Sequence, residues 1–340
     1  STSPLHYSNI HFSKSTDNGE SWSEALQINE VSGDCLDEGN TTEGAVPAVG
    51  PNGEIYVSWA GPEGLVFDKS LDEGESWLEN DIFVSDIPGP GWAFDIPGIS
   101  RCNGLPITCC NLSETEYNGD IYINWSDQRN GADDTDVWFI KSTDGGESWG
   151  ERMRVNDDPE GHQQFFTWMA VDQVTGYIWF VYYDRRNYED NNTDVFMAVS
   201  TDGGENFLNF KVSESPFLPY SSTFFGDYNN ISAHNNVVRP IWTRLEGSYP
   251  KIMTAMVNEH VIGGEELENI PFSLQQNSPN PFDESTYISF KLRSAEKVSL
   301  VVYDIYSHPV AVLVNDELLT SGKYTYHLNS QEYNLSSGFY

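Results

Sequence analysis

The chain is poor in basic residues: its 340 residues include 17 Lys and Arg against 52 Asp and Glu, a formal net charge of −35. Binding of DNA or RNA needs a basic surface, so this composition argues against a nucleic-acid partner. It also disfavours anionic membrane surfaces and favours binding of divalent cations. No run of about 18 apolar residues is present, so the sequence predicts no membrane insertion.

Cysteine is also scarce. The four residues, Cys35, Cys102, Cys109 and Cys110, form no CxxC pair and lack the Cys/His spacing of a zinc site. An even number in an exported protein predicts disulfides. We expect Cys35 to pair with one of the other three, with local pairing of Cys102 as the alternative. A bond between the adjacent Cys109 and Cys110 would be strained.

The N-terminus shows neither an initiator Met nor a signal-peptide pattern. We therefore expect the chain to be a mature or truncated piece of a longer one.

An octapeptide of the form S-x-D-x-G-x-x-W/F occurs four times. Its aspartates are Asp17, Asp72, Asp144 and Asp202. Successive copies stand 55, 72 and 58 residues apart, a period that indicates one supersecondary unit per repeat.

Strand-like runs surround the octapeptides. Each copy follows a run such as GLVFDKS or DVWFIKS, and a second run such as GDIYINWSD stands earlier in the unit. Alternating β-branched and aromatic residues bounded by Gly, Asn and Asp predict strands, and no long helical period interrupts them. We predict an all-β fold built from four-stranded antiparallel sheets. Several such sheets close most simply into a β-propeller.

Two units differ from this pattern. The first unit begins at its third strand, so we expect its inner strands to lie upstream of Ser1. The fifth unit, Phe224 to Asn258, has three strands and no octapeptide.

The octapeptide is expected in the hairpin between the third and fourth strands. There an Asp carboxylate can accept backbone N–H groups, Gly permits positive φ, and the aromatic residue can pack back on the sheet. The four copies resemble the Asp-boxes of the bacterial neuraminidase repeat, found in sialidase-like propellers. The resemblance implies a structural role for Asp17, Asp72, Asp144 and Asp202, on the face away from the ligand.

Loops between second and third strands, and the connections between units, leave the sheets on the opposite face. This face collects most of the arginines. The predicted ligand-binding residues are Arg101, Arg129, Arg186 and Arg239, and the predicted catalytic residues are Asp227 and Tyr228. Arginine binds carboxylates through two parallel hydrogen bonds, and carboxylates catalyse glycosidic cleavage. We expect these side chains to converge in one cleft near the propeller axis.

A structural alternative exists for these loops. Asp127 with Arg129, and Asp184 with Arg186, stand at the same position of their repeats and can form ion pairs that shape each turn. The resemblance to sialidases implies an arginine triad, a Tyr–Glu nucleophile and an Asp acid/base. The family's Arg-Ile-Pro element has no counterpart here before the first octapeptide. Whether the protein is an enzyme thus stays open; if it is, the resemblance implies an exo-glycosidase of sialidase type.

Clustered acidic residues make calcium a further expectation. The loop GADDTD offers oxygen ligands at Asp133, Asp134 and Asp136, without the spacing of an EF-hand. Solvated loop carboxylates are the alternative. No other cofactor is expected.

The composition changes after residue 258. We predict a propeller over residues 1–258, a linker over 259–270 and a small immunoglobulin-like β-sandwich over 271–340. The runs NSPNPF, VYDIYSHPVAVL and LSSGFY in the last segment resemble the C-terminal sorting domain of type IX secretion cargo. The resemblance implies recognition by that secretion machinery and a place outside the cell or on the outer-membrane surface of a Bacteroidetes-like bacterium.

These features predict a secreted or surface protein that binds or hydrolyses extracellular glycan. The alternative is a non-catalytic structural or adhesive surface protein, because the repeats by themselves need no ligand.

Overall fold

The computed structural model describes residues 6–36, 38–224, 226–257, 272–274, 277–292, 294–304, 308–338 and 340. These residues form strands, turns and loops without a helix, which confirms the prediction of an all-β protein. The chain divides into two compact units, Ser1–Glu259 and His260–Tyr340. The predicted linker lies outside the described residues.

Among its described residues, the first unit contains five antiparallel sheets in chain order. Two strands form the first sheet, β1 (His11–Phe12) and β2 (Leu26–Gln27). The second sheet contains β3 (Glu43–Val49), β4 (Ile55–Gly61), β5 (Gly64–Ser70) and β6 (Ile82–Ser85). The third contains β7 (Ile107–Cys110), β8 (Ile121–Asp127), β9 (Asp136–Ser142) and β10 (Met153–Arg154). The fourth contains β11 (Gln164–Val171), β12 (Ile178–Asp184), β13 (Asp194–Ser200) and β14 (Leu208–Lys211). The fifth contains β15 (Asn230–His234), β16 (Val237–Glu246) and β17 (Tyr249–Thr254).

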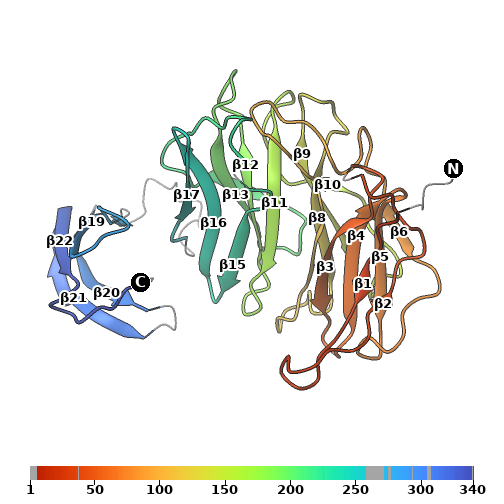
Figure 1. Ribbon diagram of the computed structural model, residues 1–340, viewed down its shortest axis with the longest axis horizontal. Helices are drawn as coiled ribbons and strands as arrows, with labels where there is room; N and C mark the ends of the chain where they lie inside the picture. Colours follow the sequence, from red (N-terminus) through yellow and green to blue (C-terminus); the bar gives the residue numbers. More distant parts are fainter. Residues whose placement is uncertain are drawn as a thin grey trace. The chain divides into compact units, whose positions relative to one another are not determined.

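Four-stranded antiparallel sheets are therefore the repeating unit, as predicted. Figure 1 shows the sheets of this unit side by side in chain order. Their first strands are neighbours: β3 contacts β7, β7 contacts β11, and β11 contacts β15. This arrangement places the first strands of the second to fifth sheets on a common inner side. Closure of the series into a complete propeller stays a prediction.

The core lies between successive sheets, because the middle strands of the four-stranded sheets are covered on both faces. All seven residues of β8, β12 and β13 are buried, and the sequence of β12, IWFVYYD, is accordingly apolar almost throughout. Aromatic residues fill much of this space; Trp59, Trp125 and Trp179 are at most 1% exposed. Burial of one large apolar side chain stabilises the fold by about 1.5–3 kcal/mol, so these layers hold neighbouring sheets together.

The four octapeptides, here called the octapeptide turns, occupy the hairpins that connect β1 to β2, β5 to β6, β9 to β10 and β13 to β14. In the third turn, Ser148 N donates to Asp144 Oδ1 at 2.9 Å and Gly146 N donates to Ser142 Oγ at 2.9 Å. The serine hydrogen bonds lower the pKa of Asp144 to about 2. The backbone N–H at the same position donates to the aspartate in the other turns, at Asp17, Asp72 and Asp202. A tight turn leaves such donors without a ladder partner, and the carboxylate supplies one.

Each octapeptide turn except the first also bonds to the preceding sheet, in what we call an inter-sheet junction. Lys69 on β5 donates to Glu147 Oε1 at 2.6 Å and to a backbone carbonyl of the same turn. The ring of Phe67 packs edge-on against Trp149, with centroids 5.1 Å apart. A Cβ atom on Gly146 would come within 2.4 Å of the Phe67 ring, so only glycine fits there.

The same groups meet at two more places. These are Phe12 and Lys14 with Gly74, Glu75 and Trp77, and Phe139 and Lys141 with Gly204, Glu205 and Phe207. The last three octapeptide turns thus have two structural roles. Each stabilises its own hairpin, and each also bonds that hairpin to the preceding sheet.

The structure corrects the expectation of disulfides. All four cysteines are free, with Cys35 exposed and Cys102 and Cys110 buried. On β7, Cys109 pairs with Tyr122 and Cys110 with Ile121, so the two neighbours point to opposite faces of the sheet. Their thiols lie in separate core clusters, where each acts as a small apolar side chain.

The second unit has two antiparallel sheets among its described residues. One contains β18 (Phe272–Leu274), β19 (Ser285–Leu292) and β22 (Gly322–Asn329), and the other β20 (Glu296–Tyr303) and β21 (Pro309–Leu319). On the first sheet Phe290 stacks on Tyr324 and Tyr326 of the neighbouring strand. The immunoglobulin-like sandwich predicted for residues 271–340 stays a prediction.

Candidate functional site

Two of the predicted ligand-binding arginines are held by carboxylates. Asp127 is fully buried at the end of β8 and accepts hydrogen bonds from Trp125 Nε1 at 2.8 Å and Arg129 Nε at 2.9 Å. The Arg129 guanidinium lies over the Trp138 ring, 4.7 Å from its centroid, and also donates to the backbone of Asp86. Its donors are therefore largely occupied by Asp127 of its own loop and by Asp86 of the preceding connection.

The equivalent loop of the next sheet repeats this arrangement. Arg186 donates through its backbone N–H and its Nε to the buried Asp184, at 2.7 and 2.9 Å, and pairs with Asp157 from the preceding connection. Burial raises the pKa of Asp184 to about 6, although the hydrogen bonds from Arg186 act in the opposite direction. These two loops have the ion pairs of the structural alternative.

The remaining predicted residues lie in two places. Arg239 lies near the start of β16 and donates to Val238 O at 2.8 Å, whereas the loop expected to carry the site follows the far end of that strand. Arg101 and Asp227 come together, with Nε and Oδ1 3.5 Å apart, and Tyr228 follows directly in the chain. The structure therefore pairs Arg101 with Asp227. It holds Arg129 and Arg186 against the aspartates of their own loops and of the preceding connections.

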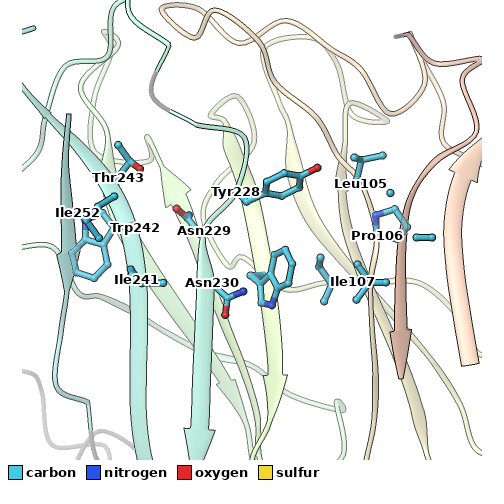
Figure 2. Close-up of a pocket in the computed structure, with 14 residues that line it drawn as sticks. Leu105, Pro106, Ile107, Tyr228, Asn229, Asn230, Ile241, Trp242, Thr243 and Ile252 are labelled. Carbon is cyan, nitrogen blue, oxygen red and sulfur yellow. The ribbon is translucent and has the colours of Figure 1, made fainter. Parts of the chain in front are cut away.

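A cavity of about 490 Å³ opens beside Tyr228. Figure 2 shows it between the inner strands, with Tyr228 and Asn230 on one side and Leu105, Pro106 and Ile107 on the other. Apolar residues of β3, β11, β16 and β17 complete the wall: Val46, Trp168, Ile241, Trp242 and Ile252. Its size lies within the range of small-molecule sites, about 300–1,000 Å³.

Two aromatic rings form one corner of the cavity. Tyr228 and Trp168 meet edge to face, with centroids 6.1 Å apart and planes at 88°. Tyr228 is 54% exposed, so a large part of its ring remains accessible. Rings placed in this way offer a flat apolar platform to a ligand.

Polar groups in the wall are few. Asn229 is buried, and its Nδ2 donates to Phe166 O at 3.0 Å. Its Oδ1 is buried and has no hydrogen-bond partner among the described residues. Asn230 and Thr243 add one amide and one hydroxyl. The described lining contains no carboxylate, whereas glycosidic hydrolysis usually needs two.

The predicted calcium ligands do not converge. Asp136 is buried and accepts hydrogen bonds from Asn130 and Asn156, each at 2.7 Å, while Asp134 accepts the N–H of Gly161 at 2.8 Å. Asp133 is exposed at the loop surface. Across the described ranges, no group of three or more His, Cys, Asp or Glu is placed to hold a metal ion.

Sequence reasoning missed most of the cavity because it searched the loops. Trp168, Ile241 and Ile252 lie within strands, where apolar residues are expected to be core. A usable signal was the alternation along β16, where exposed Val237 and Ile241 fall on one face. Within the described part of the chain, no helix has the length and apolar character needed to cross a membrane.

Comparison with known proteins places the chain in no family. No family profile and no curated protein matches the sequence. Among solved structures, the NanB sialidase of Streptococcus pneumoniae is 12% identical with a TM-score of 0.45, covering 75% of this chain and 36% of its own. A Hadza microbial sialidase is 13% identical with a TM-score of 0.43, covering 82% and 62%. The α-L-arabinanase of Penicillium chrysogenum is 15% identical with a TM-score of 0.41, covering 98% and 88%.

The chain thus spans about a third of the first of these structures. All three TM-scores are below 0.5.

Proposed function

We propose that the first unit is a propeller-type domain that binds extracellular glycan in the cavity beside Tyr228. The observation that carries this proposal is the aromatic corner of Trp168 and Tyr228, which stands next to the amide of Asn230. The C–H faces of a sugar pack on aromatic rings, and its hydroxyls bond to amides. A mostly apolar pocket with a few polar groups suits such a ligand.

Charge favours a neutral sugar over an acidic one. The net charge of −35 repels anions at long range, and Arg129 and Arg186 already bind carboxylates of the protein. Arg101 pairs with Asp227, which precedes Tyr228 in the chain. The lining without carboxylates favours binding over hydrolysis, so sialidase-type catalysis by Asp227 and Tyr228 is the weaker candidate.

The C-terminal unit supports a route to the cell exterior. Its ordered motifs resemble a type IX secretion sorting domain, and we propose that residues 271–340 direct the protein to the outside or to the outer-membrane surface. Fusion of these residues to a periplasmic reporter in a type IX secretor tests this. The reporter is expected in the medium or on the surface, and its retention in the periplasm would contradict the proposal.

A structural role remains the second candidate, because the inter-sheet junctions hold the unit together without any ligand. A glycan array followed by calorimetry separates the two. We expect a neutral-sugar hit whose affinity falls at least tenfold in Tyr228→Ala and is unchanged in Tyr249→Ala. Tyr249 is a suitable control because its ring is 78% exposed and lies outside the cavity lining. An array without hits would favour the structural role.

The same protein tests catalysis. Release of a fluorogenic leaving group from a sialoside, abolished by Asp227→Asn at unchanged thermal stability, would favour the enzyme over the binder.

A further inference from the structure

The first octapeptide turn, Ser15 to Trp22, has the turn residues of an inter-sheet junction. In the described part of the chain, no preceding strand packs against them. Trp22 is 66% exposed, whereas its counterparts Trp77 and Trp149 are partly buried against the preceding sheet. A Cβ on Gly19 would meet nothing within 4 Å, although at the other three turns it would strike a Phe ring. No ion pair to Glu20 is present within the described ranges.

The occupied junctions define what is missing. At each one a third strand supplies an aromatic residue and, two positions later, a lysine that reaches the Glu of the next turn. The distances from lysine Nζ to glutamate Oε1 are 2.6, 2.6 and 2.5 Å. The strand that supplies the aromatic residue and the lysine always belongs to the sheet that precedes the turn in the chain. Three copies with one geometry make this a rule of the repeat and not a chance contact.

We propose that the first octapeptide turn is a docking surface for one more sheet of the same type, located ahead of β1 in the polypeptide. The third strand of that sheet would place an aromatic ring over Gly19 and against Trp22, and a lysine would bind Glu20. The exposed surface has the matching chemistry: an open glycine, an indole ring and a carboxylate.

A second copy of the chain does not fit as the occupant. The lysines at Lys14, Lys69 and Lys141 are engaged within their own molecule. On β13 the equivalent positions hold Met197 and Val199. On β17, Thr254 lies at the aromatic position and Met256 falls at the lysine position. None of the described third strands therefore offers a free aromatic–lysine pair, and two chains of charge −35 repel each other.

The fourth and fifth sheets agree with this rule, because both halves of the inter-sheet junction are missing between them. β13 lacks both the aromatic ring and the lysine, and the fifth sheet, which follows it, lacks an octapeptide. The aromatic–lysine pair and the octapeptide turn are thus absent together at that junction. Because the first turn has its glycine, glutamate and tryptophan, we expect a strand with an aromatic–lysine pair to bind it.

An extended chain tests the proposal. A copy of residues 87–193 is placed ahead of Ser1 in the full chain, so that a complete sheet and two strands precede β1. Hydroxyl-radical oxidation of Trp22 is followed by mass spectrometry, with Trp77 as the internal reference. We expect the oxidation rate of Trp22 to fall several-fold, to a value close to that of Trp77.

The matched control is the same extension with F139A and K141A in the copied segment, which should leave Trp22 as reactive as in the original chain. Glu20→Gln in the first turn should restore part of the reactivity. A Trp22 that stays equally reactive with both extensions would overturn the proposal, whether or not the added segment folds. Equal protection by both extensions would also overturn it, because the aromatic–lysine pair would then not matter.

Discussion

Gly146 gives a direct measure of the inter-sheet junction. It has φ of +83° and faces the Phe67 ring, whereas its neighbour Gly145 has φ of +71° and would carry a Cβ into open space, with nothing within 4 Å. Gly145→Ala should cost only the left-handed backbone conformation, about 1–2 kcal/mol. Gly146→Ala has the same backbone cost and also forces a methyl to 2.4 Å from a buried ring. Overpacking of this kind adds about 1–3 kcal/mol.

The free energy of unfolding would be measured by urea titration with tryptophan fluorescence, on the full chain. We expect Gly146→Ala to be less stable than Gly145→Ala by the overpacking cost alone. Gly19→Ala is a second control, since Gly19 holds the same position in the first turn, with φ of +87° and no ring above it. Phe67→Leu should relieve part of the Gly146→Ala loss. Equal losses for Gly145→Ala and Gly146→Ala would refute the reasoning that the glycine is needed for sheet-to-sheet contact.

Three further predictions concern single groups. Asp144→Ala should lower the free energy of unfolding by about 1 kcal/mol, because the exposed Ser148 N–H can hydrogen-bond to water instead. Glycan binding should be unchanged, and a loss of binding at unchanged melting temperature would contradict the structural role. Burial raises the pKa of Asp68 to about 7, so the folded state binds its proton more tightly than the unfolded state does. Stability should therefore fall between about pH 4 and pH 7 and stay low above, and urea titrations should show Asp68→Asn gaining more stability at pH 8 than at pH 5; an equal gain at both would refute this. Finally, maleimide labelling without reductant should find four thiols in urea but only Cys35 reacting quickly in the native protein, because burial raises the pKa of Cys109 and Cys110 to about 12; fewer than four thiols in urea would support disulfides instead.

Local patterns were enough to predict the strands and the turns. The alternation in runs such as GDIYINWSD and the octapeptide chemistry act over fewer than ten residues, so the sequence carries them directly. The hairpin position of Asp144 and its backbone hydrogen bonds follow from the same short-range logic. The ion pair of Asp127 with Arg129 was also open to prediction, because the two residues share one loop.

The site was not predictable in the same way. Cys102 and Cys110 were candidate disulfide partners in the sequence, but burial within the fold made them core residues. The cavity brings Val46, Trp168 and Ile252 together from strands that are distant in the chain.

The sequence by itself determined which segments are strands and where the hairpins turn, because these depend on neighbouring residues. The tertiary structure alone decided that Lys69 reaches Glu147, that the Phe67 ring lies against Gly146, and that a cavity opens beside Tyr228. Those contacts depend on how one sheet packs against the next, and no short-range pattern specifies the distance and angle between two sheets.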